Sequence, residues 1–162
     1  MSARAAWRLQ TLGFAEVYRY TQGKMDWFGR GLPRAGESAK DPQLGDLANR
    51  DVPVCQLDEP VEAVRRRLAA SLWDVCVVVT EPGQVVLGIV RAASFPADEI
   101  RIEQIMESGP ITYRPSATIE DAQTYFEEND PSDLLITTND GQLVGYLTTM
   151  DVQGIQPNGR VR

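Results

Sequence analysis

Apolar residues recur along this chain in two copies of one pattern, shifted by 58 positions from residue 46 to residue 104. Each copy contains an apolar stripe with the i, i+3, i+7 spacing of one buried helix face. The stripes are Val61, Val64 and Leu68 in the first copy and Ile119, Ala122 and Phe126 in the second. Short apolar runs flank each stripe. The pattern therefore predicts two copies of strand, helix, strand, strand with a helical flank.

The two runs that follow each stripe have the length of strands, and a turn containing glycine separates them. They cover residues 75–79 and 85–90 in the first copy, and residues 134–137 and 143–147 in the second. The second turn reads Asn139-Asp140-Gly141. Asp-Gly between apolar runs indicates a hairpin, because such turns need positive φ and glycine supplies it.

Single residues refine this pattern. Gly145, inside the last predicted strand, leaves room for another backbone or for a flat ligand, and Gly88 is its counterpart in the first copy. Thr118 followed by Asp121 predicts a capping box at the start of the second helix.

Composition and period divide the chain into five parts. We expect an N-terminal segment over residues 1–34, a linker over 35–45, a first repeat over 46–95, a second repeat over 96–154 and a disordered tail over 155–162. One repeat alone leaves an apolar sheet face uncovered, so the two repeats should pack sheet to sheet.

The second repeat ends in a recognisable motif. Gly145, Leu147, Thr148 and Asp151 resemble the end of a cystathionine-β-synthase (CBS) domain, and residues 105–112 resemble the beginning of one. The resemblance covers about residues 44–154. It implies an α/β fold, a tandem CBS pair of β-α-β-β-α repeats. Such pairs usually dimerise again into a flat disc.

The resemblance also implies a ligand, an adenosine nucleotide such as AMP, ADP or ATP. Thr148 and Asp151 would hold its ribose, since a carboxylate has two acceptor oxygens and a diol has two donors. The adenine would lie against Thr112 and against the start of the strand at Asp133 and Leu134. The alternative is that Asp151 caps the helix that follows it and is satisfied without a ligand.

The first repeat departs from the motif. Arg91 replaces the threonine and Ser94 replaces the aspartate, so a ribose would lose its carboxylate there. We expect that position to be empty or to hold something else. Arg91 is a candidate phosphate contact for the neighbouring site, because a guanidinium suits phosphate geometry, and Arg114 is a second candidate. The alternative for both is a solvated surface arginine.

The N-terminal segment has its own pattern. Apolar residues between positions 5 and 12 fall on one helix face that Gly13 would cap, and we expect a strand over 17–20 and a helix over 25–30. Together with Gly31-Leu32-Pro33, this order resembles the C-terminal third of a rhodanese, a sulfurtransferase. The resemblance implies a short α/β remnant.

Rhodanese chemistry uses a cysteine in a loop just before that first helix, and none is present here. Cys55 and Cys76, the two cysteines, lie in apolar runs that are typical of a core. The remnant is therefore expected to lack sulfurtransferase activity.

Composition excludes several classes of function. The net charge of −7 argues against nucleic acid or an anionic membrane as a partner. The chain has no histidine, which removes the commonest general base and metal ligand. No apolar run suits a membrane span and no signal peptide is evident, so a cytoplasmic location is expected.

The sequence thus predicts a non-catalytic regulatory module without a cofactor. It would be a homodimer that senses an adenosine nucleotide mainly through its second repeat and signals to an unidentified protein effector. One alternative is a ligand-free structural or dimerisation protein. A less favoured one is a rhodanese-type sulfurtransferase whose natural chain starts further upstream.

Overall fold

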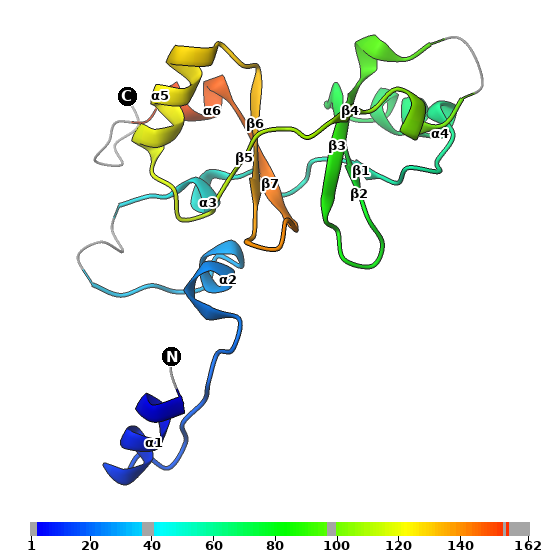
Figure 1. Cartoon of the computed structure of the whole chain (residues 1–162). Helices are drawn as coiled ribbons and strands as arrows, with labels where there is room; N and C mark the ends of the chain where they lie inside the picture. Colours follow the sequence, from blue (N-terminus) through cyan, green and yellow to red (C-terminus); the bar gives the residue numbers. More distant parts are fainter. Residues whose placement is uncertain (1–2, 37–40, 97–99, 154, 156–162) are drawn as a thin grey trace.

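The computed structural model describes residues 3–36, 41–96, 100–153 and 155. Two small sheets with helices on their outer sides stand next to each other, and the N-terminal segment extends away from them (Figure 1). The helices are α1 (Ala3–Thr11), α2 (Gly23–Gly29), α3 (Leu44–Leu47), α4 (Val61–Ala69), α5 (Ile119–Asn129) and α6 (Thr149–Gln153). Two 3₁₀ turns are η2 (Ala92–Ser94) and η3 (Ile102–Gln104).

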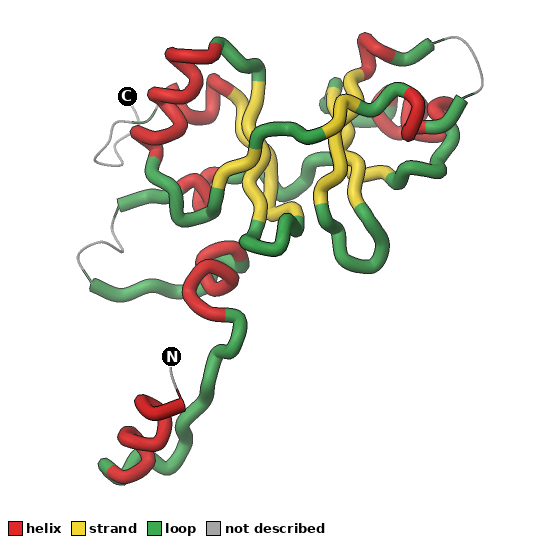
Figure 2. The backbone as a smooth tube through the Cα atoms, in the orientation of Figure 1, coloured by secondary structure: helices red, strands yellow, loops and turns green. Residues whose placement is uncertain are grey.

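The first sheet has the order β1 (Val54–Cys55), β2 (Val75–Val79), β3 (Val86–Arg91), β4 (Glu107–Ser108). The second has the order β5 (Thr112–Tyr113), β6 (Asp133–Thr137), β7 (Leu143–Thr148). In each sheet the first strand is parallel to the second, and the second is antiparallel to the third. The predicted double succession of strand, helix, strand, strand is confirmed, and Figure 2 shows both copies along the backbone.

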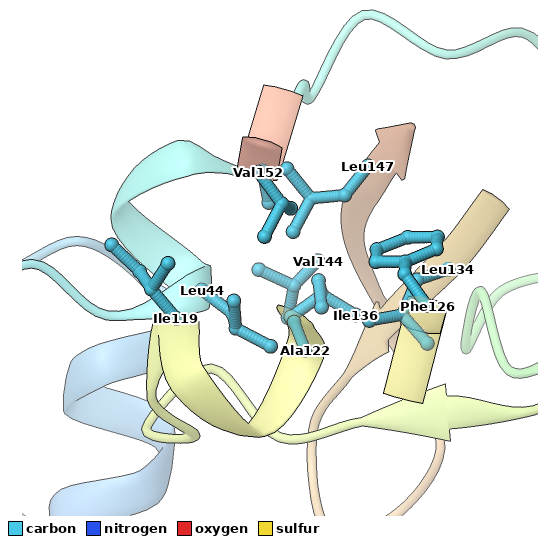
Figure 3. Close-up of a cluster of buried hydrophobic side chains, with 10 residues drawn as sticks. Leu44, Ile119, Ala122, Phe126, Leu134, Ile136, Val144, Leu147 and Val152 are labelled. Atoms are coloured by element: carbon cyan, nitrogen blue, oxygen red, sulfur yellow. The ribbon is translucent and has the colours of Figure 1, made fainter. Parts of the chain in front are cut away.

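Each apolar stripe faces its own sheet. Val61, Val64 and Leu68 are buried in the first repeat's core, together with both cysteines. In the second repeat, Ile119, Ala122 and Phe126 pack with Leu44, Leu134, Ile136, Val144, Leu147 and Val152 (Figure 3). Thr118 and Asp121 form the predicted capping box of α5. We expected Ile155 to belong to a disordered tail, but it packs against this same core.

A third buried cluster joins the repeats. It combines Val75, Val77, Val79 and Ile89 of the first sheet with Leu135 and Tyr146 of the second. The Trp73 and Tyr146 rings meet edge to face across this boundary, with centroids 5.5 Å apart. At the turn ends of the sheets, the amide of Val86 donates to Gly141 and that of Leu143 donates to Gln84, both at 3.0 Å.

The segment that precedes each repeat in the sequence packs on the other repeat, so these two lead segments are exchanged. The first lead segment (residues 43–49) packs on the second repeat, where Asn49 and Tyr146 bond reciprocally through their backbones at 2.9 Å. The second lead segment (residues 101–107) packs on the first repeat, where Glu107 pairs with Ile89.

Glycine makes this exchange possible. A Cβ on Gly145 would lie 2.7 Å from the Asn49 carbonyl oxygen, and one on Gly88 would lie 2.5 Å from that of Glu107. The close neighbour predicted at Gly145 is therefore backbone, not a flat ligand.

The N-terminal segment is only partly attached. Its α2 packs against the turn end of the second sheet, where Gly29 faces Thr138 and Val144, and Arg50 donates to the Gly29 carbonyl at 2.9 Å. Both predicted helices are present. The strand expected over residues 17–20 is wrong: this stretch forms no strand and pairs with none in the described part of the chain.

Candidate functional site

The sheet topology places most of the candidate residues at one end of the strands of the second sheet, which we call the edge of that sheet. Asp133 begins β6 and lies opposite Thr148, the last residue of β7, which leads directly into α6 and Asp151. Thr112 is exposed and lies on the other side of β6, where it pairs with Leu135. The edge therefore presents a threonine from β5, a carboxylate from β6 and the β7–α6 turn.

Thr148 and Asp151 form a closed local unit. One carboxylate oxygen of Asp151, Oδ2, accepts from both the backbone amide and the hydroxyl of Thr148, each at 2.7 Å. The Asp151 amide points back to the Thr148 hydroxyl at 3.4 Å. Thr148, not Asp151, thus occupies the N-cap position of α6, and Asp151 is its partner in a capping box. The Asp151 side chain is exposed, and its Oδ1 accepts no hydrogen bond from the described residues.

Asp133 is already paired across the repeats. Its Oδ2 lies 2.6 Å from Nη1 of Arg91, at the end of β3, and accepts a hydrogen bond from the Tyr146 hydroxyl at 2.8 Å. Its side chain is 13% exposed and that of Arg91 is 29% exposed. Arg91 also lies 3.8 Å from Glu107. The alternative interpretation of Arg91 as a solvated surface residue is therefore wrong.

The pKa values reflect this cluster. Burial alone would raise the pKa of Asp133, but hydrogen bonds from Arg91 and Tyr146 outweigh burial and hold it below its ordinary value. Burial and the bond to Asp133 raise the pKa of Tyr146. The bond to Asp133 raises the pKa of Arg91 above its already high value. At neutral pH the group is an ion pair with a neutral phenol.

Two of the predicted site residues do not present their side chains at this edge. The side chain of Leu134 is 1% exposed and belongs to the second repeat's core, so only its backbone can face a ligand. Arg114 follows β5 and donates to the carbonyl of Thr138, at the turn end of β6. Because Asp133 begins that strand and Thr138 follows its end, Arg114 is not brought together with Thr148 and Asp151.

Sequence reasoning missed Tyr146 and the partnership of Arg91 with Asp133. A signal for Tyr146 existed, because a phenol in an otherwise apolar strand needs a hydrogen-bond partner when buried. No sequence signal pairs Arg91 with Asp133, since these residues meet only when the two sheets pack.

The charge of the site is unbalanced. Between Arg114 and Arg160 the sequence has no lysine or arginine but eight aspartates and glutamates. Arg91, supplied by the first repeat, is the cation that reaches this edge within the described residues. Among the described residues, Arg91 is therefore the group that would attract an anion to this edge.

Two cavities lie away from Thr148 and Asp151. One of about 530 Å³ lies between α4 and η2 and is lined by Trp73 and Phe95, and one of about 700 Å³ lies in the N-terminal segment beside Tyr18 and Trp27. Thr148 and Asp151 line neither of these two cavities.

Other chemistry finds little support in the described part of the chain. No group of three or more acidic or cysteine side chains is arranged to hold a metal ion there. Cys55 and Cys76 are both buried, so neither offers an accessible sulfur nucleophile. None of the described helices has the length and apolar content needed to cross a bilayer.

Comparisons with known proteins agree on the fold. The family model of the CBS domain matches residues 44–94 and 102–155. The structure of CBSX2 in complex with AMP superimposes with a TM-score of 0.62 at 19% identity, covering 68% of this chain and 92% of that one. Another structure of CBSX2, from Arabidopsis thaliana, gives 0.59 at 18% identity, covering 69% and 92%.

The cytosolic domain of the Mg²⁺ channel MgtE in complex with ATP gives a TM-score of 0.63 at 22% identity, covering 70% of this chain but 48% of that chain. No curated protein matches the sequence.

Proposed function

The chain belongs to the CBS-domain family, and from this we propose that it is a non-catalytic regulatory module that binds an adenosine nucleotide at the edge of its second repeat. The observation that carries the proposal is the Thr148–Asp151 unit. Asp151 is exposed and holds one oxygen free, next to a hydroxyl that is fixed in place. The complexes of CBSX2 with AMP and of MgtE with ATP add support, because both have this fold.

The ribose is proposed to lie on Asp151. Its two hydroxyls are donors, and the free Oδ1 has two lone pairs, which can accept both. Because Thr148 already orients the carboxylate, little side-chain entropy is lost when the sugar binds. The adenine would then extend along the sheet edge toward Thr112 and the backbone at Asp133 and Leu134.

The phosphate is proposed to meet Arg91. A guanidinium that is held 2.6 Å from one carboxylate can turn part of its donor fork toward a phosphate. Arg91 comes from the first repeat and the ribose site from the second, so a bound nucleotide would bridge both. It would favour the relative orientation of the repeats in which both contacts form. The signal would pass to another protein, and we propose a homodimer as the functional unit.

Charge favours a small anion. Among the described residues, Arg91 is the cation at this edge and Asp133 and Asp151 are the anions, so each added phosphate charge meets repulsion from these two carboxylates. We therefore expect AMP to bind more tightly than ADP, and ADP more tightly than ATP, by roughly threefold per added charge. Isothermal titration calorimetry at one ionic strength measures this order, and ATP binding most tightly would contradict it.

The decisive variant is Asp151→Ala. AMP should raise the melting temperature of the wild type but not that of the variant. The matched control is Asp121→Ala, which removes the equivalent carboxylate from the capping box of α5, away from this edge. Both variants should lose about 1 kcal/mol of stability, since each keeps its N-cap threonine but loses the carboxylate of the capping box. Only the control should keep its response to AMP.

A ligand-free structural module is the second candidate function. It is favoured by the fact that Asp133 and Asp151 both have hydrogen-bond partners within the protein. It predicts that no adenosine nucleotide changes the melting temperature of the wild type at millimolar concentration.

A further inference from the structure

Four of the seven large apolar side chains that are exposed in the described part of the chain lie close together in the sequence. Trp7, Leu12, Phe14 and Tyr18 are exposed by 63, 59, 59 and 81%. All four belong to residues 3–20, which we call the N-terminal arm. Figure 1 shows α1 standing apart from both sheets. A nine-residue helix is marginal in water by itself. Within the described residues the arm is held at its C-terminal end, where the Tyr20 ring meets Trp27 edge to face at 5.1 Å, while the four side chains named above stay exposed.

The arm is basic where the second repeat is acidic. It carries Arg4, Arg8 and Arg19 against a single acid, Glu16. On α5, the side chains of Glu120, Glu127 and Glu128 are exposed, and that helix has no basic residue. Opposite charges of this kind steer two surfaces together and set their register.

From this complementarity we propose that the N-terminal arm docks on α5 of a second copy of this chain, in a reciprocal exchange. Helix α2 is anchored at the turn end of the second sheet by Gly29 and Arg50, and from there the arm extends away from its own α5 (Figure 1). A twofold exchange uses each arm and each α5 once and closes the assembly. The exposed tryptophan and phenylalanine would be covered, and the arginines would face the glutamates.

A membrane surface suits the arm less well. Basic helices with aromatic residues do bind anionic lipids. Here the whole chain carries −7, however, so an anionic bilayer would repel most of the molecule while attracting the arm. The acidic helix of a second copy offers the same attraction without that penalty.

The test is a charge exchange measured by sedimentation velocity over a dilution series of the full-length protein. Arg8→Glu and Glu127→Lys, each alone, should weaken self-association at least about tenfold, since each sets like charges against each other. An equimolar mixture of the two variants should associate again to within about threefold of the wild type, because each mutant arm then meets a mutant helix. Arg66→Glu, an exposed arginine on α4, is the matched control and should leave self-association unchanged.

Three results would overturn the proposal. They are a wild type that stays monomeric, single variants that associate like the wild type, and a mixture that fails to recover. Binding of the arm to anionic phosphatidylserine vesicles with no Arg8-dependent self-association would instead favour the membrane. All substituted side chains are exposed, and unchanged melting temperatures would show that folding is intact. The readout needs no nucleotide, so the outcome is independent of the function proposed above.

Discussion

Arg91 connects the two repeats at the level of a single residue. It ends β3 of the first sheet and pairs with Asp133, the first residue of β6 in the second. Tyr146, whose ring packs against Trp73, donates to the same carboxylate oxygen. A cross-repeat contact thus lies at the proposed phosphate position, and a ligand there would act on the packing of the repeats.

Replacing Asp133 with Asn should destabilise the protein by about 1–3 kcal/mol at pH 7, because Arg91 then stays half-buried and keeps only the more distant and more exposed carboxylate of Glu107, at 3.8 Å, as a counter-ion. The folded-state pKa of Asp133 is lowered, so its contribution is complete above the unfolded value near 4 and is lost as the pH falls through the lower folded value. Urea unfolding of wild type and variant at pH 7 and pH 3 measures the difference. A gap that does not narrow at pH 3 would argue against the ion pair.

The backbone conformation of Gln84 leads to a second prediction about a single residue. It adopts a φ of 49° in the first hairpin, where the second hairpin has Gly141 at 82°. Replacing Gln84 with Gly should stabilise the protein by about 0.5–1 kcal/mol, since a left-handed conformation costs a side chain about 1–2 kcal/mol and glycine adds entropy to the unfolded chain. Chemical denaturation measures it, with Gly141→Ala expected to change stability in the opposite direction.

The elements themselves were largely readable from the sequence. The stripes at Val61 and Ile119 predicted α4 and α5, and the Asp140-Gly141 turn predicted the β6–β7 hairpin. Gly145 predicted the close approach of another backbone or of a flat ligand, without indicating which of the two or which segment. The neighbour is Asn49 of the first lead segment, and the repeat period had assigned that segment to the other repeat. Short segments carry too few apolar residues to indicate which sheet they join.

Gly145→Ala tests the exchanged packing of these elements. Its Cβ would lie 2.7 Å from the Asn49 carbonyl and 2.8 Å from the Cβ of Ala48, so the lead segment must shift. We expect a loss of about 1–3 kcal/mol. Gly83→Ala, whose Cβ would meet ordinary contacts at 3.6 Å, is the control and should change stability by less than about 0.5 kcal/mol. Equal effects of the two substitutions would mean that the lead segment yields freely.

At the scale of the whole molecule, the two repeats form one folding unit. They share the cluster around Val77 and Tyr146, the Arg91–Asp133 pair and two exchanged lead segments. The sequence indicated a pair of repeats that pack sheet to sheet. It could not indicate this mutual dependence, because each contact joins residues that are far apart along the chain.

We therefore expect a single cooperative unfolding transition. Trp73, at the boundary between the repeats, should report the same midpoint by fluorescence as far-ultraviolet circular dichroism reports for the helices of both. Two separate midpoints would show that the repeats unfold independently.

The exchanged lead segments also bear on how such a protein could arise. In a chain with only one repeat, the strand that contains the glycine equivalent to Gly145 could pair with the lead segment of another such chain. The present molecule is equivalent to two such chains joined covalently. The covalent link makes their association intramolecular, at an effective concentration on the order of millimolar. Covalent joining then leaves each half free to lose what the other retains, and Arg91 and Ser94 differ in this way from Thr148 and Asp151.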